Sequence, residues 1–291
     1  MQDNNVKYQS LSIQSDLRQF VRHLWTVQAE PNEGDYFVFR TYASTNPTLL
    51  FVVNGHVEPI NTQVKGKLLL IGQTNKWFRF KATNDFQLVG ITFFPFAMPL
   101  LFNLAADTIT NKILDHNFIS QNERLMEFCK NISLCYLKHE SINALLSDMV
   151  STIELKDEDL LSLITKSSSG DLDREELTHK SLFMSQRNFE RKFKHYSGFS
   201  PKTFTNLVRI KKSFDAISFG QSTLSDTAFE QSYFDQAHFS NEFKKHTGFQ
   251  PKVFSKHDKD HNSIWTDFVD FFQFLSICPP VLCKNKISLR L

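Results

Sequence analysis

The chain has 291 residues, of which 41% are hydrophobic and 22% are charged, and its formal net charge is +2. This composition excludes a wholly disordered chain, and the length allows two domains with separate cores. Because no apolar run reaches the ~18 residues of a membrane span, and because the start from Met1 to Asp16 is too polar for a signal sequence, we expect a cytoplasmic protein that enters no membrane.

The sequence lacks the motifs of the common enzyme and metal-binding classes. The cysteines, which show neither CxxC nor CxxH spacing, are Cys129, Cys135, Cys278 and Cys283. The run from His56 to Glu58 echoes a metal-binding motif of cupin barrels, but no other histidine has the spacing that such a site requires. Ser-His-Asp signatures, phosphate-binding glycine loops and Walker-type lysines are also missing. We therefore expect no catalytic residue, no metal site and no cofactor.

Residues 1–150 are predicted to form a β-rich sensor or dimerisation domain. A helix is predicted over 16–27 from apolar residues at helical spacing, which are Leu17, Phe20, Val21, Leu24 and Trp25. Strands are predicted over 48–53, 67–71, 76–80 and 86–94, with a hairpin turn at Asn54-Gly55 and a helix over 96–104. About six strands with attached helices favour a cupin-like or related barrel. The thirty phenylalanines of the chain indicate either an apolar pocket or a core packed with aromatic rings.

An amphipathic helix is predicted over 122–137. Its apolar stripe consists of Leu125, Phe128, Cys129, Ile132, Cys135 and Tyr136. We favour packing of this stripe on its own domain, and the alternative is a homodimer through 122–137. A helix over 159–166 and a Ser-Gly turn over 167–170 follow, so we place the domain boundary between 149 and 155.

An internal repeat at an offset of fifty positions dominates the segment from Leu172 to Phe254. The first copy of the eight identical residues is Phe189, Phe193, Lys194, Gly198, Phe199, Pro201, Lys202 and Phe204. The second copy is Phe239, Phe243, Lys244, Gly248, Phe249, Pro251, Lys252 and Phe254. Two copies are too few for a solenoid, so we interpret them as one helical unit that is duplicated.

Each copy has the pattern of a helix-turn-helix unit. Two phenylalanines four residues apart pack inward from one helix face. Upstream of each pair stands an N-cap candidate, Ser185 or Asp235, and downstream stands Gly198 or Gly248, which ends the helix in a left-handed conformation.

We call the second helix of each unit its recognition helix, and expect it over 185–194 in the first unit and 235–245 in the second. Shorter first helices are predicted within 172–184 and 224–234. A linker helix over 205–219 joins the units. Its length of roughly 22 Å, at ~1.5 Å per residue, is compatible with two recognition helices in major grooves one DNA turn apart.

The outward faces of both recognition helices are polar or basic. They carry Arg187, Asn188, Arg191 and Lys194 in the first unit and Ala237, His238, Asn241 and Lys244 in the second. Arg and Asn pair bidentately with guanine and adenine, and Lys and Arg contact phosphates. A solvated helix face is the plainer interpretation of one such helix, but two equivalent ones favour DNA binding. From Lys180 to Lys256, thirteen Lys or Arg stand against six Asp or Glu, and this local charge of about +7 is typical of a DNA-binding module.

At these residues the chain resembles the AraC/XylS family of bacterial transcription regulators, over about Leu155 to Lys256. The signature of the second unit stands here as Thr227-Ala228, Ser232-Tyr233 and the run from Phe239 to Pro251, and that of the linker as Arg209 to Ser213. Thr227, Ser232 and Asn241 depart from the usual Ile, Gly and Arg. The start of the chain, with Leu-x-x-Phe-Val-x-x-Leu-Trp and later Gly-Ile-Thr-Phe-Phe-Pro, resembles the N-terminal domain of some such regulators.

The resemblance implies an α+β chain with a β-rich, cupin-like or related sensor domain at 1–150 and an all-α domain with two helix-turn-helix units at 155–258. It implies a sequence-specific transcriptional regulator that binds promoter DNA, contacts RNA polymerase and responds to a small-molecule effector. Two alternatives stay open. The N-terminal domain could serve only to dimerise or to bind a protein partner, or the chain could be an enzyme fused to a DNA-binding module.

The expected DNA contacts lie at the start and along the outward face of each recognition helix. They are Ser185, Gln186, Arg187, Asn188, Glu190, Arg191 and Lys194 in the first unit, and Gln236, Ala237, His238, Asn241, Lys244 and Lys245 in the second. We expect the first unit to supply most base contacts and the second to rely more on phosphates. Residues 259–291 form an apolar appendage, and such a segment usually docks on a domain or a partner.

Overall fold

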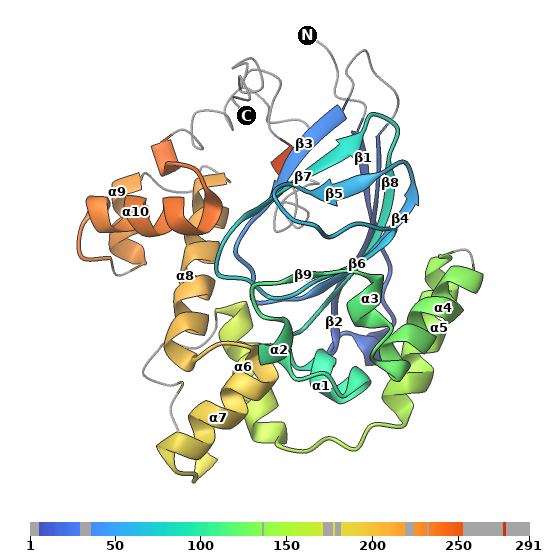
Figure 1. Ribbon diagram of the computed structural model, residues 1–291. Coiled ribbons are helices and arrows are strands. Elements are labelled where there is room, and N and C mark those ends of the chain that lie inside the picture. The colour runs from blue at the N-terminus through green and yellow to red at the C-terminus, as the bar shows by residue number, and fades with distance from the viewer. Residues whose placement is uncertain are drawn as a thin grey trace.

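The computed structural model contains a β-rich part and a helical part that lie side by side (Figure 1). The structure describes residues 6–29, 36–135, 137–170, 177, 182–218, 224–231, 233–252 and 276–277. Among them, no helix combines the length and the apolarity that crossing a bilayer requires. The expected α+β organisation, with the β-rich part first and the helix-turn-helix part last, is confirmed.

Two antiparallel sheets face each other in the β-rich part. The six-stranded sheet contains, in spatial order, β1 (Val6–Leu11), β2 (Val21–Ala29), β8 (Gln87–Phe93), β4 (Thr48–Asn54), β6 (Leu68–Ile71) and β9 (Ile113–Leu114). The four-stranded sheet contains β10 (Ser276–Ile277), β3 (Tyr36–Thr41), β7 (Phe78–Thr83) and β5 (Val57–Pro59).

Aromatic and branched side chains fill the space between the sheets. Phe39 stacks on Phe80 with ring centroids 5.2 Å apart, and Phe37 meets Phe86 edge-on at 5.5 Å. Burying a side chain of this size contributes roughly 1.5–3 kcal/mol. In this part of the molecule the aromatic side chains therefore form a packed core, the second of the two interpretations.

Helices cover one end of the sheets, at the lower right of Figure 1. They are α1 (Ala97–Phe102), α2 (Ala106–Ile109), α3 (His116–Ile119), α4 (Glu123–Leu134) and α5 (His139–Ser151). The apolar stripe of α4 is buried, and Phe128 meets Phe102 of α1 with centroids 5.4 Å apart. Packing of this stripe on its own domain is thus confirmed, although Cys135 is only half-buried and Tyr136 lies outside the described residues.

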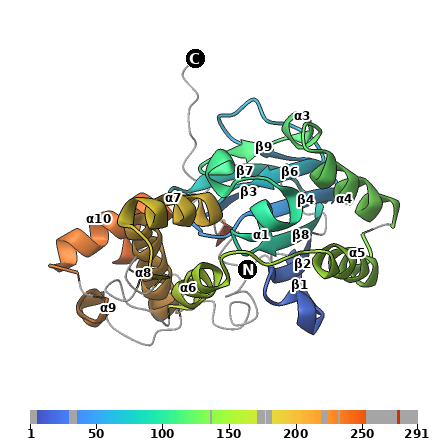
Figure 2. The same ribbon diagram turned by 90° about the horizontal axis from the view of Figure 1, so that it is seen from below.

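The helical part is built around one long helix. Its elements are α6 (Glu158–Ser169), α7 (Gln186–Ser197), α8 (Pro201–Ser218), α9 (Leu224–Glu230) and α10 (Gln236–Thr247). Helix α8 runs between the two recognition helices, α7 and α10 (Figures 1 and 2). The first helix of the first unit was predicted within 172–184, most of which lies outside the described residues, as does most of the 259–291 appendage.

The predicted helix over 16–27 is wrong. A short 3-10 turn, Ser15–Leu17, precedes strand β2, which pairs with β1 on one side and with β8 on the other. Because β2 is interior to the sheet and has buried side chains on both faces, its apolar residues do not alternate with polar ones. A register shift between Val21 and His23 adds to the irregularity, so the apolar spacing resembles that of a helix.

The predicted hairpin at Asn54-Gly55 is also wrong. Strands β4 and β5 belong to different sheets, and Gly55, with φ of 71°, carries the chain from one sheet to the other. A Cβ at Gly55 would lie 2.4 Å from the Thr83 hydroxyl, so both the space and the backbone conformation require glycine.

Two helices are longer than predicted. The Ser-Gly turn over 167–170 is helical up to Ser169, where the Ser168 hydroxyl donates to the Ile164 carbonyl at 2.9 Å, and only Gly170 ends α6. The linker helix, predicted over 205–219, begins at Pro201 and runs to Ser218 as a single helix of 18 residues. The domain boundary between 149 and 155 falls near the connection from α5 to α6 and stays a prediction.

Candidate nucleic-acid interface

Each recognition helix begins at the capping side chain that the sequence predicts. The Ser185 hydroxyl accepts a hydrogen bond from the N–H of Asn188 at 3.4 Å, and the Asp235 carboxylate accepts one from the N–H of His238 at 2.6 Å. Such caps satisfy N–H groups that lack a partner within the helix and contribute roughly 0.5–2 kcal/mol. Both N-cap predictions are confirmed.

The repeated phenylalanines anchor both helices from the inside. Phe189 and Phe193 lie with ring centroids 5.6 Å apart, and Phe204 of α8 meets Phe193 edge-on at 5.4 Å. In the second unit Phe239 and Phe243 repeat the contact at 5.6 Å. All five side chains are buried, which confirms the inward face and fixes the opposite face toward solvent.

The expected DNA contacts lie on that solvent face. Those with exposed side chains are Ser185, Gln186, Arg187, Glu190, Arg191, Lys194, Gln236, Ala237, His238, Asn241, Lys244 and Lys245, and Asn188 is half-buried. The structure therefore places each set on one accessible helix face. Contact of these residues with DNA stays a prediction.

Side chains on the outward face of α7 hold one another. The Arg191 guanidinium donates to the Asn188 side-chain oxygen at 2.9 Å, and the Gln186 amide donates to the Glu190 carboxylate at 3.0 Å. Residues three or four apart on a helix are surface neighbours, so these contacts reduce side-chain freedom before any ligand binds. The arginine that we expect to read bases is thus partly oriented in advance.

The basic face of α10 is partly neutralised. The Glu242 carboxylate accepts from the Asn206 amide at 2.9 Å and lies 3.1 Å from the Lys245 amine and 3.4 Å from the His246 ring. Burial alone would raise the pKa of Glu242, but the hydrogen bonds from Asn206 and Lys245 and the two positive partners lower it to about 2. Lys245 thus shares its charge with Glu242, whereas Lys244 forms no ion pair within the described residues.

The C-terminal end of α7 is docked on the β-rich part. Gly198 follows the helix with φ of 79°, and its carbonyl accepts a hydrogen bond from the Thr110 hydroxyl at 3.0 Å. A Cβ at this position would lie 1.8 Å from the Gln73 amide nitrogen and 2.4 Å from the Thr110 hydroxyl. The close approach and the left-handed backbone both require glycine here.

The C-terminal end of α10 is docked at the corresponding position. Gly248, with φ of 78°, accepts a hydrogen bond on its carbonyl from the Arg40 guanidinium at 3.2 Å. The same guanidinium lies 4.7 Å from the Trp77 ring and 4.2 Å from the Phe249 ring, so it packs against one aromatic residue of each part. Cation–π contacts of this kind contribute roughly 0.5–2 kcal/mol each.

His246 adds a second group of contacts to the docking of α10. The Ala43 N–H donates to the His246 carbonyl at 3.1 Å, and Nδ1 of the His246 ring lies 2.6 Å from the Asn75 carbonyl. Because a carbonyl oxygen only accepts, Nδ1 carries a proton. Burial lowers the pKa of His246 below its ordinary value, against the opposing influence of the Asn75 carbonyl and Glu242.

These contacts attach both recognition helices to the β-rich part by the same end, the C-terminal one. Each helix has 12 residues and is therefore about 18 Å long. Each is held at its C-terminal glycine, so its N-terminal end lies the length of the helix away from that contact. Sequence reasoning missed Arg40, Thr110 and Asn75, because nothing in the local pattern marks a residue that docks a helix far away in the chain.

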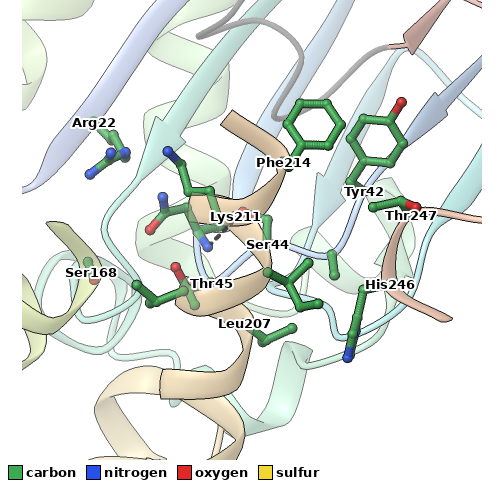
Figure 3. Close-up of a pocket in the computed structure, with 14 residues that line it drawn as sticks. Arg22, Tyr42, Ser44, Thr45, Ser168, Leu207, Lys211, Phe214, His246 and Thr247 are labelled. Atoms are coloured by element: carbon green, nitrogen blue, oxygen red, sulfur yellow. Dashed lines mark hydrogen bonds between the residues drawn. The ribbon is translucent and has the colours of Figure 1, made fainter. Parts of the chain in front are cut away.

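A small cavity lies at the junction of the two parts (Figure 3). Its lining includes Arg22 of β2, the segment from Tyr42 to Asn46, Ser168 of α6, residues of α8 from Leu207 to Phe214, and His246 and Thr247 of α10. The cavity volume is about 30 Å³, room for two or three waters when each needs about 10–15 Å³. Lys211 also lines it and pairs with Asp215 at 2.7 Å. Two cationic side chains and several hydroxyls thus line a small, partly open space.

Comparisons with known proteins divide the chain in a similar way. A family model described as a helix-turn-helix domain matches residues 179–257, and a model of a domain of unknown function matches residues 12–115. No curated protein sequence matches the chain significantly.

Among solved structures, the chain is similar to crystal structures of ToxT from Vibrio cholerae. One, from strain O395, is 15% identical, with 80% of this chain and 97% of that chain covered and a TM-score of 0.39. A second, bound to (E)-4-(8-methylnaphthalen-1-yl)but-3-enoic acid, is 15% identical, with 80% and 98% covered and a TM-score of 0.40. A third, wild-type ToxT of strain SCE256 with an unsaturated fatty acid bound, is 13% identical, with 78% and 96% covered and a TM-score of 0.36.

Proposed function

We propose that the chain is a DNA-binding transcriptional regulator of the AraC type, because a helix-turn-helix family model matches residues 179–257, and that α7 and α10 enter successive major grooves on one face of the DNA. The N-terminal residues of a recognition helix make its base contacts, and the two units of such a domain read sites about one helical turn apart. Helix α8, which joins the units, has 18 residues and is therefore about 27 Å long.

The observation that carries this proposal is that both recognition helices are attached to the β-rich part by their C-terminal ends. Thr110 holds the C-terminal end of α7, and Arg40 holds that of α10. The capped N-terminal ends lie the length of a helix from these contacts, and in the proposal they are the ends that approach DNA. Base contacts come from Arg187 and Arg191 in the first unit, and phosphate contacts come from Lys244 in the second.

Selection of DNA from a random duplex pool with the full-length chain tests the proposal. The recovered sequences are expected to share two half-sites with centres about 10 base pairs apart. Recovery of a single half-site would contradict simultaneous entry of both helices. A pool that shows no enrichment over the input would contradict sequence-specific binding altogether.

We further propose that the junction cavity receives an anionic small-molecule effector. Arg22 and Lys211 bring cationic side chains from the two different parts of the molecule into its lining, and Lys211 also pairs with Asp215 at 2.7 Å. Since the cavity holds only two or three waters, an effector larger than this must move the two parts relative to each other as it enters. Effector binding and the position of the recognition helices are thereby coupled.

Titration with a fatty acid tests the effector proposal, because ToxT binds an unsaturated fatty acid. The acid, kept below its micelle concentration, is expected to change the affinity for the selected duplex, whereas its uncharged methyl ester leaves it unchanged. Lys211→Gln should remove the response while preserving DNA binding without the acid. A response to both the acid and the ester would contradict a site selected by charge.

RNA polymerase and a second copy of the chain are the proposed protein partners, in the cytoplasm where the DNA lies. A homodimer through 122–137 would have to use the outer side of α4, where Leu134 is 75% exposed, because the apolar stripe is buried in its own domain. Sedimentation of the chain with Leu134→Glu tests this directly. An unchanged dimer would exclude this helix face.

A further inference from the structure

Two phenylalanines stand exposed at the starts of the recognition helices. Phe183 is 100% exposed and lies two residues before the N-cap Ser185, and Phe234 is 92% exposed and directly precedes the N-cap Asp235. Single exposed apolar residues are common on protein surfaces. Two large exposed rings at the same end of two duplicated helices, by contrast, call for a physical explanation.

Neither ring is needed to start its helix. An apolar residue just before an N-cap often packs on the fourth residue of the helix and fixes the entry of the chain. In the second unit Tyr233 makes this contact, with its ring 5.1 Å from that of Phe239. In the first unit Met184 packs against the apolar cluster that contains Phe189. Local packing is therefore complete without the two exposed rings.

The backbone at Phe183 adds an independent observation. Its φ is 50°, in the left-handed region, where a residue with a side chain other than Asn or Asp carries a cost of roughly 1–2 kcal/mol. Most other non-glycine residues with positive φ in the described part of the chain are Asn or Asp, which tolerate this conformation. Strained backbone of this kind concentrates at functional sites, where the strain serves to place a side chain.

The position of the two rings points to their partner. They lie beyond the N-terminal ends of α7 and α10, the length of a helix away from the docking contacts of Thr110 and Arg40. Arg187 follows Phe183 by four residues, and Arg191 and Lys244 lie farther along the two helices. These exposed cations favour a polyanion. Duplex DNA is a polyanion that also offers apolar groups where a recognition helix enters it, because its thymines present a 5-methyl group in the major groove.

We propose that Phe183 and Phe234 are specificity-determining residues whose rings pack against thymine methyl groups, one in each half-site. The inference rests on the proposed DNA-binding function and goes beyond it, because it adds apolar readout to the polar contacts expected of the outward faces. Each ring would select thymine over cytosine at one position, since cytosine lacks the methyl group.

Single thymine-to-deoxyuridine substitutions in the selected duplex test this contact, because they remove one methyl group and leave base pairing intact. Burial of one methyl group contributes ~0.8 kcal/mol, so the wild-type chain is expected to bind about fourfold more weakly at one position in each half-site. Phe183→Ala should abolish this sensitivity in one half-site and Phe234→Ala in the other. Both variants should keep the wild-type dependence on salt, since no charge changes.

Two controls separate readout from a general loss of apolar surface. Phe183→Leu and Phe234→Leu keep an apolar side chain and should keep part of the deoxyuridine sensitivity. Phe229→Ala removes a third exposed ring, 85% exposed on α9 of the second unit, and should leave the sensitivity at wild-type level, because the first helix of a unit does not enter the groove.

Three results would overturn the inference while leaving the proposed function standing. The wild-type chain could bind every deoxyuridine duplex as tightly as the parent, the alanine variants of Phe183 and Phe234 could retain the wild-type sensitivity, or Phe229→Ala could lose it equally. Failure of the full-length chain to enrich any sequence would instead overturn the proposed function first, and this inference with it.

Discussion

The two helix-turn-helix units share eight identical residues and have caps at corresponding positions, yet they are held in the molecule in different ways. In the first unit, Phe189, Phe193 and Phe204 belong to the same apolar cluster as Phe93 and Phe102 of the β-rich part. In the second unit, the buried rings form a separate cluster with Ile210, Phe214 and Ile217 of α8, to which the described residues of the β-rich part add Tyr42 alone.

This difference shows that a duplicated sequence does not imply duplicated packing. The first unit shares the core of the β-rich part, so moving it would expose buried apolar surface. The described contacts that attach the second unit to the β-rich part centre on the Arg40 guanidinium, the His246 ring and the hydrogen bond from the Ala43 N–H to the His246 carbonyl. We infer that α10 is the recognition helix whose position an effector can change at the lower cost.

The largest expected effect comes from truncating one core phenylalanine in each unit. Phe193→Ala and Phe243→Ala each remove a fully buried ring, which costs roughly 3–5 kcal/mol of unfolding free energy. Because Phe193 lies in the shared core, its loss should speed hydrogen exchange in β8 and α7 together. Phe243→Ala should act on α9 and α10 and leave the exchange of β8 amides unchanged. Equal effects of both variants on the exchange of β8 amides would contradict the claim that the first unit alone shares the core of the β-rich part.

Loss of the docking contacts should also affect the two units unequally. Arg40→Ala removes the hydrogen bond to Gly248 and the contact with Phe249, together worth about 2 kcal/mol, so amides near the C-terminal end of α10 should exchange faster. Thr110→Val is the matched variant for the first unit, because it removes the hydrogen bond to Gly198 while the shared core still holds α7. Similar changes in α7 and α10 would show that the core does not distinguish them.

Base readout should fall more in the first unit than in the second. Arg191→Ala is expected to reduce discrimination at one or two base pairs by roughly 1–3 kcal/mol, because it removes a bidentate donor. Asn241→Ala, at the corresponding position of α10, should reduce it less. Competition binding against a set of single-base-pair variants of the selected duplex measures both. Equal weakening of specific and random DNA by Arg191→Ala would remove this residue from the base contacts.

The smallest expected effect concerns the two neighbouring lysines of α10. Lys244→Ala should flatten the slope of log affinity against log salt by about one unit, as expected for one lost phosphate contact. Lys245→Ala should change the slope less, because Lys245 already pairs with Glu242 at 3.1 Å. An unchanged slope in Lys244→Ala would exclude Lys244 as a phosphate contact, and a larger change in Lys245→Ala would show that DNA breaks the pair.

The helix-turn-helix units could be predicted in detail because their signals are local. These signals act within a few residues of one another, as the cap at Ser185, the glycine at Gly198 and the phenylalanine spacing show. Each signal also occurs in both copies of the repeat. Strand β2 could not be predicted in this way, because its apolar pattern reflects neighbours on both faces of the sheet that are distant in the chain.

The docking of the units lay beyond sequence reasoning for the same physical reason. Arg40 and Gly248 are 208 positions apart, and a single arginine in a strand gives no sign of its partner. The exposed Phe183 and Phe234 are the opposite case. Apolar residues beside a helix start predict burial, and only the structure shows that Met184 and Tyr233 occupy the buried positions instead.

The most direct test of the account is the affinity of the full-length chain for its selected duplex and for a scrambled duplex of equal length, measured across a salt series. We expect a preference on the order of a thousandfold or more for the selected duplex, together with a steep loss of affinity as salt rises. Equal affinity for both duplexes at every salt concentration, or no binding at low salt, would contradict a regulator that reads DNA sequence through both helix-turn-helix units.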